Sequence, residues 1–432
     1  MKNFFSSQIE QIRVAGFFVL FTKIKKILIL LYSIFSLLIF FPIYIITILI
    51  SPYILIRFGF IYTSRIGHFV GNTELYLLES KEEINIKKIR HIDFFVTDGH
   101  ISNNFLFEKY LKRIKILPYL IGYPSLTFFR FCNKFSTFFF KFLIPSTKQG
   151  DRDVNCLMEK FNSNFFFSNQ EIDDGFNQLQ RIGLQKNSRF VYLIVRDKAY
   201  LNENFKKDWS YHSYRDCSIH NYYKLAEELA RNKIYTIRMG KKVKERFLDK
   251  NNNYLIDYAN SEYKSDFLDI FLASQCFFAI STGCGLDSVP DVLFRKPILF
   301  SDVAPIGYLR TYSSRYLLTF KKYYSSNNGK ALTLTEIFNN NLGYLVHAND
   351  YKINNIYLQE SSPEELAEYA KEMLLRVEKK WIDNNEDVIN QKLFWNTFDK
   401  HSINNEFNSI MHKKIHSIVS SNFLKTNKNI IL

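Results

Sequence analysis

The stretch CFFAISTGCGLDSVPDVLFRKPILF, residues 276–300, decides the fold class of this chain. It reads as an apolar strand, a turn with two glycines, a short helix over Ser288–Phe294 and a second apolar strand. The same alternation extends upstream, and we predict strands at Phe190–Val195, Ile234–Met239, Tyr254–Tyr258, Cys276–Ile280 and Pro297–Phe300. Short apolar strands that alternate with helices are typical of a parallel sheet covered by helices. The sequence therefore predicts an α/β fold.

The first half of the chain repeats this alternation less regularly. We predict strands at Arg57–Ser64 and His91–Val96 and an amphipathic helix within Asn104–Ile116. A further helix over Gln170–Ile182 ends at Gly183, and glycine is a common stop signal for helices. We place a domain boundary at this glycine.

These patterns predict two Rossmann-like domains that face a cleft, because ligands of open α/β sheets bind beyond the carboxyl ends of the strands. A capped helix beginning with Ser-Pro-Glu-Glu at residue 362 opens the last part of the chain. The predicted organisation is a membrane-associated hydrophobic segment at 1–57, a first Rossmann-like domain at 58–183, a second at 184–345 and a C-terminal helical extension at 346–432.

The composition excludes several classes of protein. Of the 432 residues, 47% are hydrophobic and 23% are charged, which is enough apolar material for a packed core. The five cysteines are odd in number and contain no Cys-x-x-Cys pair, which argues against a disulfide scaffold and a structural zinc site. This usage of cysteine fits a reducing compartment.

The net charge of +15 is concentrated in two windows. Residues 1–60 contain six basic side chains and one acidic one, and residues 101–150 contain eight basic side chains and one acidic one. Both windows are also rich in Phe, Ile and Leu, a mixture that suits an anionic lipid surface. A nucleic-acid binder can also be basic, but residues 27–56 are far too apolar for one, so we expect no nucleic-acid partner.

Residues 27–56 carry no charge and are bounded by Lys26 and Arg57. As a helix of 1.5 Å rise per residue the run measures about 45 Å, against a hydrocarbon core of about 30 Å. Pro42 and Pro52 favour a break or kink. Basic residues before the run hold the N-terminus in the cytoplasm, and one span would export the remainder. We therefore favour a re-entrant or in-plane anchor over a single span, and keep both readings open.

A second stretch, Leu126–Leu143, has a helical stripe of polar residues among many phenylalanines. The stripe consists of Arg130, Lys134, Thr137 and Lys141. A core helix with one wet face is the more common form of such a pattern. Its basic face keeps membrane docking, or contact with a lipid-linked acceptor, as an alternative.

The turn after the strand Cys276–Ile280 is the strongest candidate for a binding site. Glycines allow backbone amides to approach a phosphate, and a helix N-terminus adds a positive field. We therefore expect Ser281, Thr282, Gly283 and Gly285 to bind phosphate. Two arginines at equivalent strand ends, Arg196 and Arg238, are expected to assist, because guanidinium groups contact phosphate oxygens in a forked geometry.

In the first domain the equivalent strand end carries Arg65, Gly67 and His68. We expect Arg65 and Gly67 on the acceptor side and His68 as the base that takes a proton from an acceptor hydroxyl. Glu74 is a second catalytic candidate, either orienting His68 or acting in its place. A structural or helix-capping role for His68 stays open. Since no Asp-x-Asp pair flanks a strand end, we expect no metal in the chemistry.

Several blocks carry a family resemblance; they read RIGH (65–68), NTELYL (72–77), YLIVRD (192–197), YRDC (214–217), RMG (238–240), SDFLD (265–269), STG (281–283), GL (285–286), DSVP (287–290) and LTLTEI (332–337). Over roughly residues 60–380 the chain resembles a bacterial family of glycosyltransferases, GT-B-like, associated with surface polysaccharide synthesis. The family pattern often has Asn where Asp216 stands, and Ser or Thr where Cys284 stands. Neither change touches the backbone amides of the turn.

The resemblance implies a nucleotide-sugar donor, held by residues 184–345, and an acceptor held by residues 58–183. We therefore expect a metal-independent enzyme that moves a sugar from a nucleoside diphosphate sugar to a glycan or lipid-linked acceptor. It would use no cofactor, contact the membrane surface through residues 27–56, and work on the cytoplasmic side of the bacterial cytoplasmic membrane. Two alternatives stay open, namely a nucleotide-sugar epimerase or hydrolase and a non-catalytic membrane scaffold of a glycan assembly complex.

Overall fold

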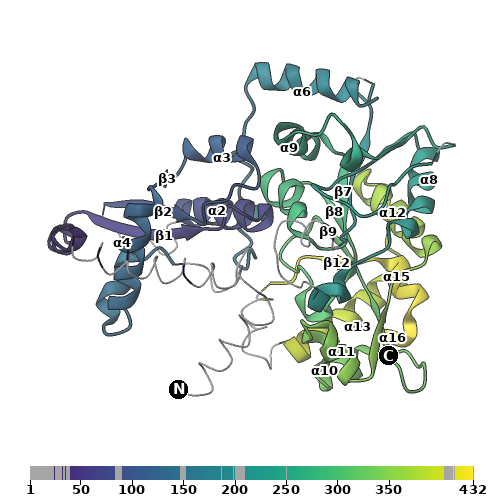
Figure 1. The fold of residues 1–432 in the computed structure, drawn as a ribbon. Helices are drawn as coiled ribbons and strands as arrows, with labels where there is room; N and C mark the ends of the chain where they lie inside the picture. The colour runs from purple at the N-terminus through teal and green to yellow at the C-terminus, as the bar shows by residue number, and fades with distance from the viewer. Residues whose placement is uncertain are drawn as a thin grey trace. The chain divides into compact units, whose positions relative to one another are not determined.

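The computed structural model describes residues 24, 32, 35, 39–82, 90–145, 152–185, 187–197, 199, 210–249, 251–402, 412 and 414–431. The chain divides into two compact units (Figure 1). Unit 1 comprises residues 1–62, 85–100 and 108–146, and unit 2 comprises residues 63–84, 101–107 and 147–432. This division differs from the predicted boundary at Gly183, because residues 63–84, 101–107 and 147–183 fold with the second half of the chain.

Unit 2 is built on a parallel sheet in the order β12-β9-β8-β7-β4-β5-β6. The five predicted strands are all present in this sheet, which has two further strands that were not predicted. The strands are β4 (Phe190–Ile194), β5 (Tyr235–Arg238), β6 (Leu255–Ile256), β7 (Phe278–Ser281), β8 (Ile298–Val303), β9 (Tyr316–Phe320) and β12 (Ile418–Val419). The fully buried strands β4, β7 and β9 are continuous apolar runs, as expected when helices cover both faces of a sheet. The predicted α/β class is confirmed for this unit.

The helices of unit 2 begin at residues that satisfy their first backbone amides. Ser265 accepts a hydrogen bond from the amide of Leu268 at the start of α9. Ser362 and Glu365 form a reciprocal capping box at the start of α12, with Pro363 in the first turn, as the sequence predicts. The helices of unit 2 include α2 (Ile66–Lys81), α5 (Leu157–Lys160), α6 (Asn169–Arg181), α8 (Tyr223–Arg231), α9 (Asp266–Gln275), α10 (Leu334–Asn339), α11 (Ala348–Ile353), α12 (Pro363–Val377), α13 (Asn385–Ser402), α15 (Ser421–Thr426) and α16 (Lys428–Ile431).

The last part of the chain belongs to the body of unit 2. Strand β12 pairs with β9 and adds an edge to the sheet. The buried carboxylate of Glu372 in α12 accepts hydrogen bonds from Ser420 Oγ at 2.7 Å and the Ser421 amide at 3.0 Å. A hairpin of β10 (Lys322–Ser325) and β11 (Ile356–Gln359) is antiparallel. The described residues of 346–432 therefore pack into unit 2 and include strands as well as helices.

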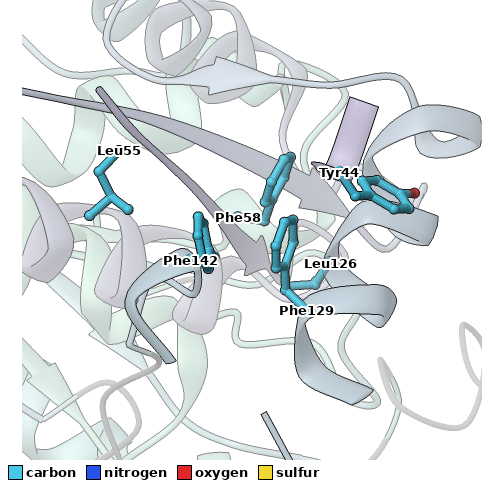
Figure 2. Close-up of a cluster of buried hydrophobic side chains, with 6 residues drawn as sticks. All are labelled: Tyr44, Leu55, Phe58, Leu126, Phe129 and Phe142. Carbon is cyan, nitrogen blue, oxygen red and sulfur yellow. The ribbon is translucent and has the colours of Figure 1, made fainter. Parts of the chain in front are cut away.

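Unit 1 has a three-stranded parallel sheet, β1-β2-β3. The strands are β1 (Leu55–Ile61), β2 (His91–Thr97) and β3 (Lys115–Ile116). Unit 1 also contains a helix at 39–50, which precedes β1, and α4 (Tyr119–Cys132) and a 3₁₀ segment (Thr137–Phe142), which follow β3. The helix α3 (Asn104–Leu111) spans the boundary between the two units in the sequence. Figure 2 shows the buried cluster of unit 1, in which Phe129 stacks on Phe58 and on Phe142 at centroid distances of 5.4 and 4.7 Å.

Arg57 has a different role from the flanking charge that the sequence suggests. It lies buried in β1, opposite Asp93 of β2, and its Nε donates to Asp93 Oδ1 at 2.7 Å. Removal of one partner from a buried ion pair destabilises the folded protein, because the other charge is left unpaired. Arg57 thus links β1 to the central strand β2 of unit 1.

The predicted membrane segment is only partly described. Most of residues 1–38, which include the first half of the apolar run 27–56, lie outside the described residues. Residues 39–50 of that run are helical. Among the helices of the described residues, none is both long enough and apolar enough to cross a bilayer.

Candidate functional site

A pocket of about 690 Å³ opens at the carboxyl edge of the unit 2 sheet. Its described lining follows the ends of four strands: residues 194–197 after β4, residues 239–243 after β5, residues 282–286 after β7 and residues 303–308 at and after β8. This is the edge at which open α/β sheets bind their ligands. All of the described lining residues belong to unit 2.

The charge of this lining is strongly positive. Among the described residues that line the pocket, seven are lysine or arginine and two are aspartate. The basic residues are Arg65, Arg152, Arg196, Arg215, Lys241, Lys242 and Arg310, and the acidic ones are Asp197 and Asp269. Clefts lined by one sign of charge concentrate ligands of the opposite sign. The pocket therefore suits an anionic ligand.

The turn after β7 lines the pocket, but its polar groups are largely used within the chain. The amide of Thr282 donates to the Ile194 carbonyl, and the amide of Gly283 donates to Ser281 Oγ at 3.0 Å. The amide of Cys284 donates to Asp287 Oδ2 at 2.8 Å. Three backbone amides of the turn that was expected to bind phosphate thus already donate hydrogen bonds within the chain. The turn forms part of the pocket wall, and we expect the ligand contacts to come mainly from side chains.

The buried carboxylate of Asp287 organises this turn. It accepts hydrogen bonds from Ser281 Oγ at 3.0 Å and from Cys284, and it pairs with Arg310 Nη2 at 2.8 Å. Burial raises the pKa of Asp287, while the charge of Arg310 opposes that rise. Asp287 therefore holds both the turn and one basic wall of the pocket.

The N-terminus of α2 packs directly on the same turn. A Cβ atom added to Gly67 would lie 2.6 Å from the Cα of Gly285, so only glycine allows this approach of the two backbones. Arg65 and His68, on either side of Gly67, line the pocket. Three residues that the sequence assigned to the first domain therefore lie in unit 2, beside the turn.

Arg196 and Arg215 form the most cationic part of the pocket. Arg196 Nε pairs with Asp216 Oδ1 at 3.2 Å, and the Arg196 amide donates to Thr282 Oγ1 at 2.9 Å. Arg215 Nη2 donates to the carbonyl of Gly283. Burial lowers the pKa of Arg215, and the like charge of Arg196 lowers it further. A pair of neighbouring guanidinium groups in this state gains free energy when a multiply charged anion binds.

The pKa of His212 is lowered to about 4, first by burial and then by the same positive charges, those of Arg196 and Arg215. At neutral pH the imidazole is therefore uncharged. An uncharged imidazole in the pocket wall can both donate and accept hydrogen bonds.

A second part of the pocket lining is basic as well, and the charge of its Arg310 is compensated by carboxylates. Arg310 pairs with Asp287 and, through Nη1 at 3.2 Å, with Asp291. Arg152 Nη1 donates to the carbonyl of Tyr308 at 3.0 Å. The aromatic side chains of this region that line the pocket are Tyr214, Phe300, Tyr308 and Tyr312. This part of the lining is suited to a planar or apolar part of a ligand.

The structure brings seven of the ten predicted site residues to the pocket. They are Arg65, Gly67, His68, Arg196, Thr282, Gly283 and Gly285. Ser281 is buried behind the turn. Glu74 is buried in α2 and lies outside the lining of the pocket; burial lowers the pKa of Arg295, and the charge of Glu74 opposes that shift.

Arg238 also lies outside the lining. Its side chain is 1% exposed and is held between Asp197 Oδ2 at 3.6 Å and Asp257 Oδ1 at 3.7 Å. Burial lowers the pKa of Arg238, and the two carboxylates oppose that shift. The structure thus places Arg238 beneath the end of β5, as a support for the loop that carries Lys241 and Lys242.

Several lining residues were missed by sequence reasoning. Arg215 was noticed only as part of the block YRDC, and no strand or turn pattern singled it out. Asp269, within the block SDFLD, was not singled out as a site residue either. It lines the pocket, and burial raises its pKa to about 6. A carboxyl group with such a pKa can exchange a proton near neutral pH.

Among the described residues, no group of three or more His, Cys, Asp or Glu side chains is placed to hold a metal ion. The absence of a metal from the chemistry stays a prediction, as does the role of His68 as a base.

Comparison with known proteins gives weak similarities only. No protein-family model matches the chain, and no curated protein is significantly similar to it. Among solved structures, the ADP-heptose LPS heptosyltransferase II of E. coli is 12% identical, with a TM-score of 0.36, over 61% of this chain and 90% of that chain. The family 9 glycosyltransferase of Veillonella parvula DSM 2008 is 9% identical, with a TM-score of 0.42, over 74% of this chain and 97% of that chain. At these scores the likeness supports no functional argument, which therefore rests on the pocket.

Proposed function

We propose that the protein is a glycosyltransferase that moves a sugar from a nucleoside diphosphate sugar to a hydroxyl acceptor. The observation that carries the proposal is the pair Arg196 and Arg215 in a basic pocket at the carboxyl edge of a parallel sheet. A diphosphate supplies the negative charge that this pair lacks. The volume of about 690 Å³ falls within the range of small-molecule sites.

Two parts of the pocket lining divide the ligand between them. The diphosphate would lie against Arg196, which pairs with Asp216, and Arg215, which donates to the Gly283 carbonyl. The base of the nucleotide would lie against the aromatic side chains Phe300, Tyr308 and Tyr312. Planar rings stack on such side chains with favourable free energy.

The proposed reaction is a single displacement or its two-step equivalent at the anomeric carbon. An acceptor oxygen forms a bond to that carbon, and the bond from the carbon to the diphosphate oxygen breaks. The electron pair of the broken bond leaves with the nucleoside diphosphate, whose growing charge is stabilised by Arg196 and Arg215. The proton of the acceptor hydroxyl passes to His68, which lines the pocket.

The acceptor and the location are further parts of the proposal. We propose a glycan or lipid-linked acceptor on the cytoplasmic side of a bacterial membrane. No cofactor or metal is required in this scheme, because the arginine side chains supply the charge stabilisation.

Calorimetry of the full chain with UDP- and GDP-sugars tests the donor site, with CMP-sugars, which carry a single phosphate, as the comparison. Arg215→Ala should weaken binding of the preferred donor about ten- to hundred-fold, since a charged hydrogen bond contributes about 1.5–3 kcal/mol. Arg231→Ala is the matched control, because Arg231 is an exposed arginine of α8 that pairs with Glu228 of the same helix and does not line the pocket. Absence of binding across the whole panel would refute the proposal.

A further inference from the structure

Unit 1 carries a large exposed apolar surface. It consists of the helix 39–50 with Tyr53, the residues Leu120 and Ile121 at the start of α4, and the aromatic residues Phe131, Phe135, Phe138 and Phe140 at and after its end. We call this set the docking surface. Leu49, Tyr53 and Phe135 are 68%, 80% and 76% exposed. Exposed apolar side chains in such number mark an interaction site rather than an ordinary protein surface.

The segments of the docking surface are neighbours in the fold. Tyr44, on the inner side of the helix 39–50, stacks on Phe128 of α4 with ring centroids 4.4 Å apart. Lys141 Nζ donates to Ser51 Oγ at 2.9 Å and lies over the ring of Phe138. Figure 2 shows Tyr44 beside Phe129 at the buried side of these elements. The exposed residues therefore project from a common, packed base.

The helix 39–50 is apolar beyond the face that it needs for packing. Tyr44 and Thr47 are buried against unit 1, whereas Ile39, Ile43 and Ile46 are exposed. A helix that is apolar all round belongs in an apolar surrounding. The described part of this helix packs on unit 1 through one face and exposes apolar side chains on its other faces. Such a helix suits a position in the plane of a membrane interface.

The charge around the docking surface selects the kind of partner. Residues 109–145 contain seven basic side chains and no acidic one, and Arg130 and Lys134 are exposed among the aromatic residues. Basic residues beside exposed aromatic ones fit the headgroup region of an anionic bilayer. A second copy of the same surface would bring like charges together, which opposes association.

We propose that unit 1 docks on the surface of a bilayer containing anionic phospholipid, with the helix 39–50 lying in the interface and Phe135 and Phe138 inserted beside it. This inference deepens the proposed membrane location and rests on contacts within unit 1. Its test is separate from the test of sugar-nucleotide binding, which takes place in a pocket of unit 2.

Co-sedimentation with vesicles tests the proposal. The full chain should bind vesicles of phosphatidylcholine and phosphatidylglycerol (3:1) at least tenfold more tightly than vesicles of phosphatidylcholine alone. The double variant Phe135→Ser and Phe138→Ser should lose at least tenfold in affinity for the anionic vesicles. The double variant Arg130→Ala and Lys134→Ala should lose most of the preference for phosphatidylglycerol.

Phe166→Ser is the matched control. Phe166 is as exposed as Phe135, at 74%, but lies in unit 2, and its replacement should leave vesicle binding unchanged. Calorimetry with the nucleotide sugar should be the same for all of these variants, which separates the two proposals. Equal binding to both kinds of vesicle, or an unchanged affinity after Phe135→Ser and Phe138→Ser, would overturn the inference. So would a lipid-free dimer, seen by sedimentation velocity, that these two substitutions abolish.

Discussion

Arg215 and His212 show how burial sets the chemistry of single residues in the pocket. Each has a pKa lowered first by burial and then by neighbouring positive charge, and Arg196 contributes to both shifts. In both residues burial and the neighbouring charge disfavour the cationic form, and a bound anion would favour it again. The pocket is thus prepared for an anion before the anion arrives.

Binding of a nucleoside diphosphate should raise the pKa of His212 from about 4 toward its ordinary value by at least one unit. The reason is that a nearby anion favours the imidazolium form. NMR titration of isotopically labelled histidine, with and without the nucleotide, measures this shift. His412, whose pKa is lowered to about 3 first by burial and then by the charge of Arg152, lies outside the pocket lining and should move less than His212. Ligand binding with no change at His212 would contradict the account.

His412 also makes a prediction about stability. Its Nε2 donates to the carbonyl of Gly307 at 2.8 Å, and its Nδ1 lies 3.0 Å from Thr311 Oγ1. Because the folded state keeps this imidazole neutral, protons bind preferentially to the unfolded chain below about pH 6.5, and lower pH destabilises the fold through this residue. His412→Gln should be less stable than the parent at pH 7.5.

The difference in unfolding free energy between parent and His412→Gln should narrow by about 1.4 kcal/mol at pH 5.5, one unit below the ordinary histidine pKa. Urea unfolding at the two pH values measures it. A difference that does not change with pH would show that the pKa of His412 is the same in the folded and unfolded states, which would contradict the lowered value.

At the scale of single residues, the sequence predicted part of the site for a physical reason. Arg196 and the turn residues follow strands directly, and the ends of parallel strands meet at one edge. Arg238 follows the same rule yet faces Asp197 and Asp257, because the direction of a side chain depends on neighbours that are distant in sequence. Arg215 follows no strand, so its place in the pocket could be learned only from the fold.

At the scale of elements, the strands and capped helices of unit 2 were largely predictable. Continuous apolar runs predicted β4, β7 and β8, and local capping residues predicted α9 and α12. The strands β9 and β12 were not predicted. Their partners in the sheet come from remote parts of the chain, and β12 has only two residues, Ile418–Val419. Short strands of this kind carry no periodicity that can be recognised.

The contact between α2 and the turn after β7 is the element-scale feature on which the pocket depends. Gly67→Ala should weaken nucleotide-sugar binding at least tenfold, because the added Cβ would lie 2.6 Å from the Gly285 backbone and force the two elements apart. Calorimetry measures the loss, and thermal unfolding should show a destabilisation of about 1–3 kcal/mol.

Gly329→Ala is the control for this substitution. Gly329 has a φ of +69° and open space around it, so its replacement should lower stability without reducing the affinity of the pocket. If both alanine variants lose affinity in proportion to their loss of stability, the contact of Gly67 has no special role in the site.

At the scale of the whole molecule, the predicted boundary at Gly183 was misplaced. The chain enters unit 2 early, through residues 63–84 and 101–107, and returns to unit 1 afterwards. A linear reading of the sequence assigns neighbouring segments to the same domain, and so it cannot detect such a crossing. This crossing brings Arg65, Gly67 and His68 into the lining of the unit 2 pocket. The cleft between two domains stays a prediction.

The central claim is that Arg196 and Arg215 bind the diphosphate of a nucleotide sugar. A crystal structure of the full chain with a bound nucleoside diphosphate tests it most directly. The account predicts phosphate oxygens within about 3 Å of both guanidinium groups, the usual length of a charged hydrogen bond. A diphosphate bound elsewhere, with Arg196 still on Asp216 and Arg215 still on the Gly283 carbonyl, would contradict it.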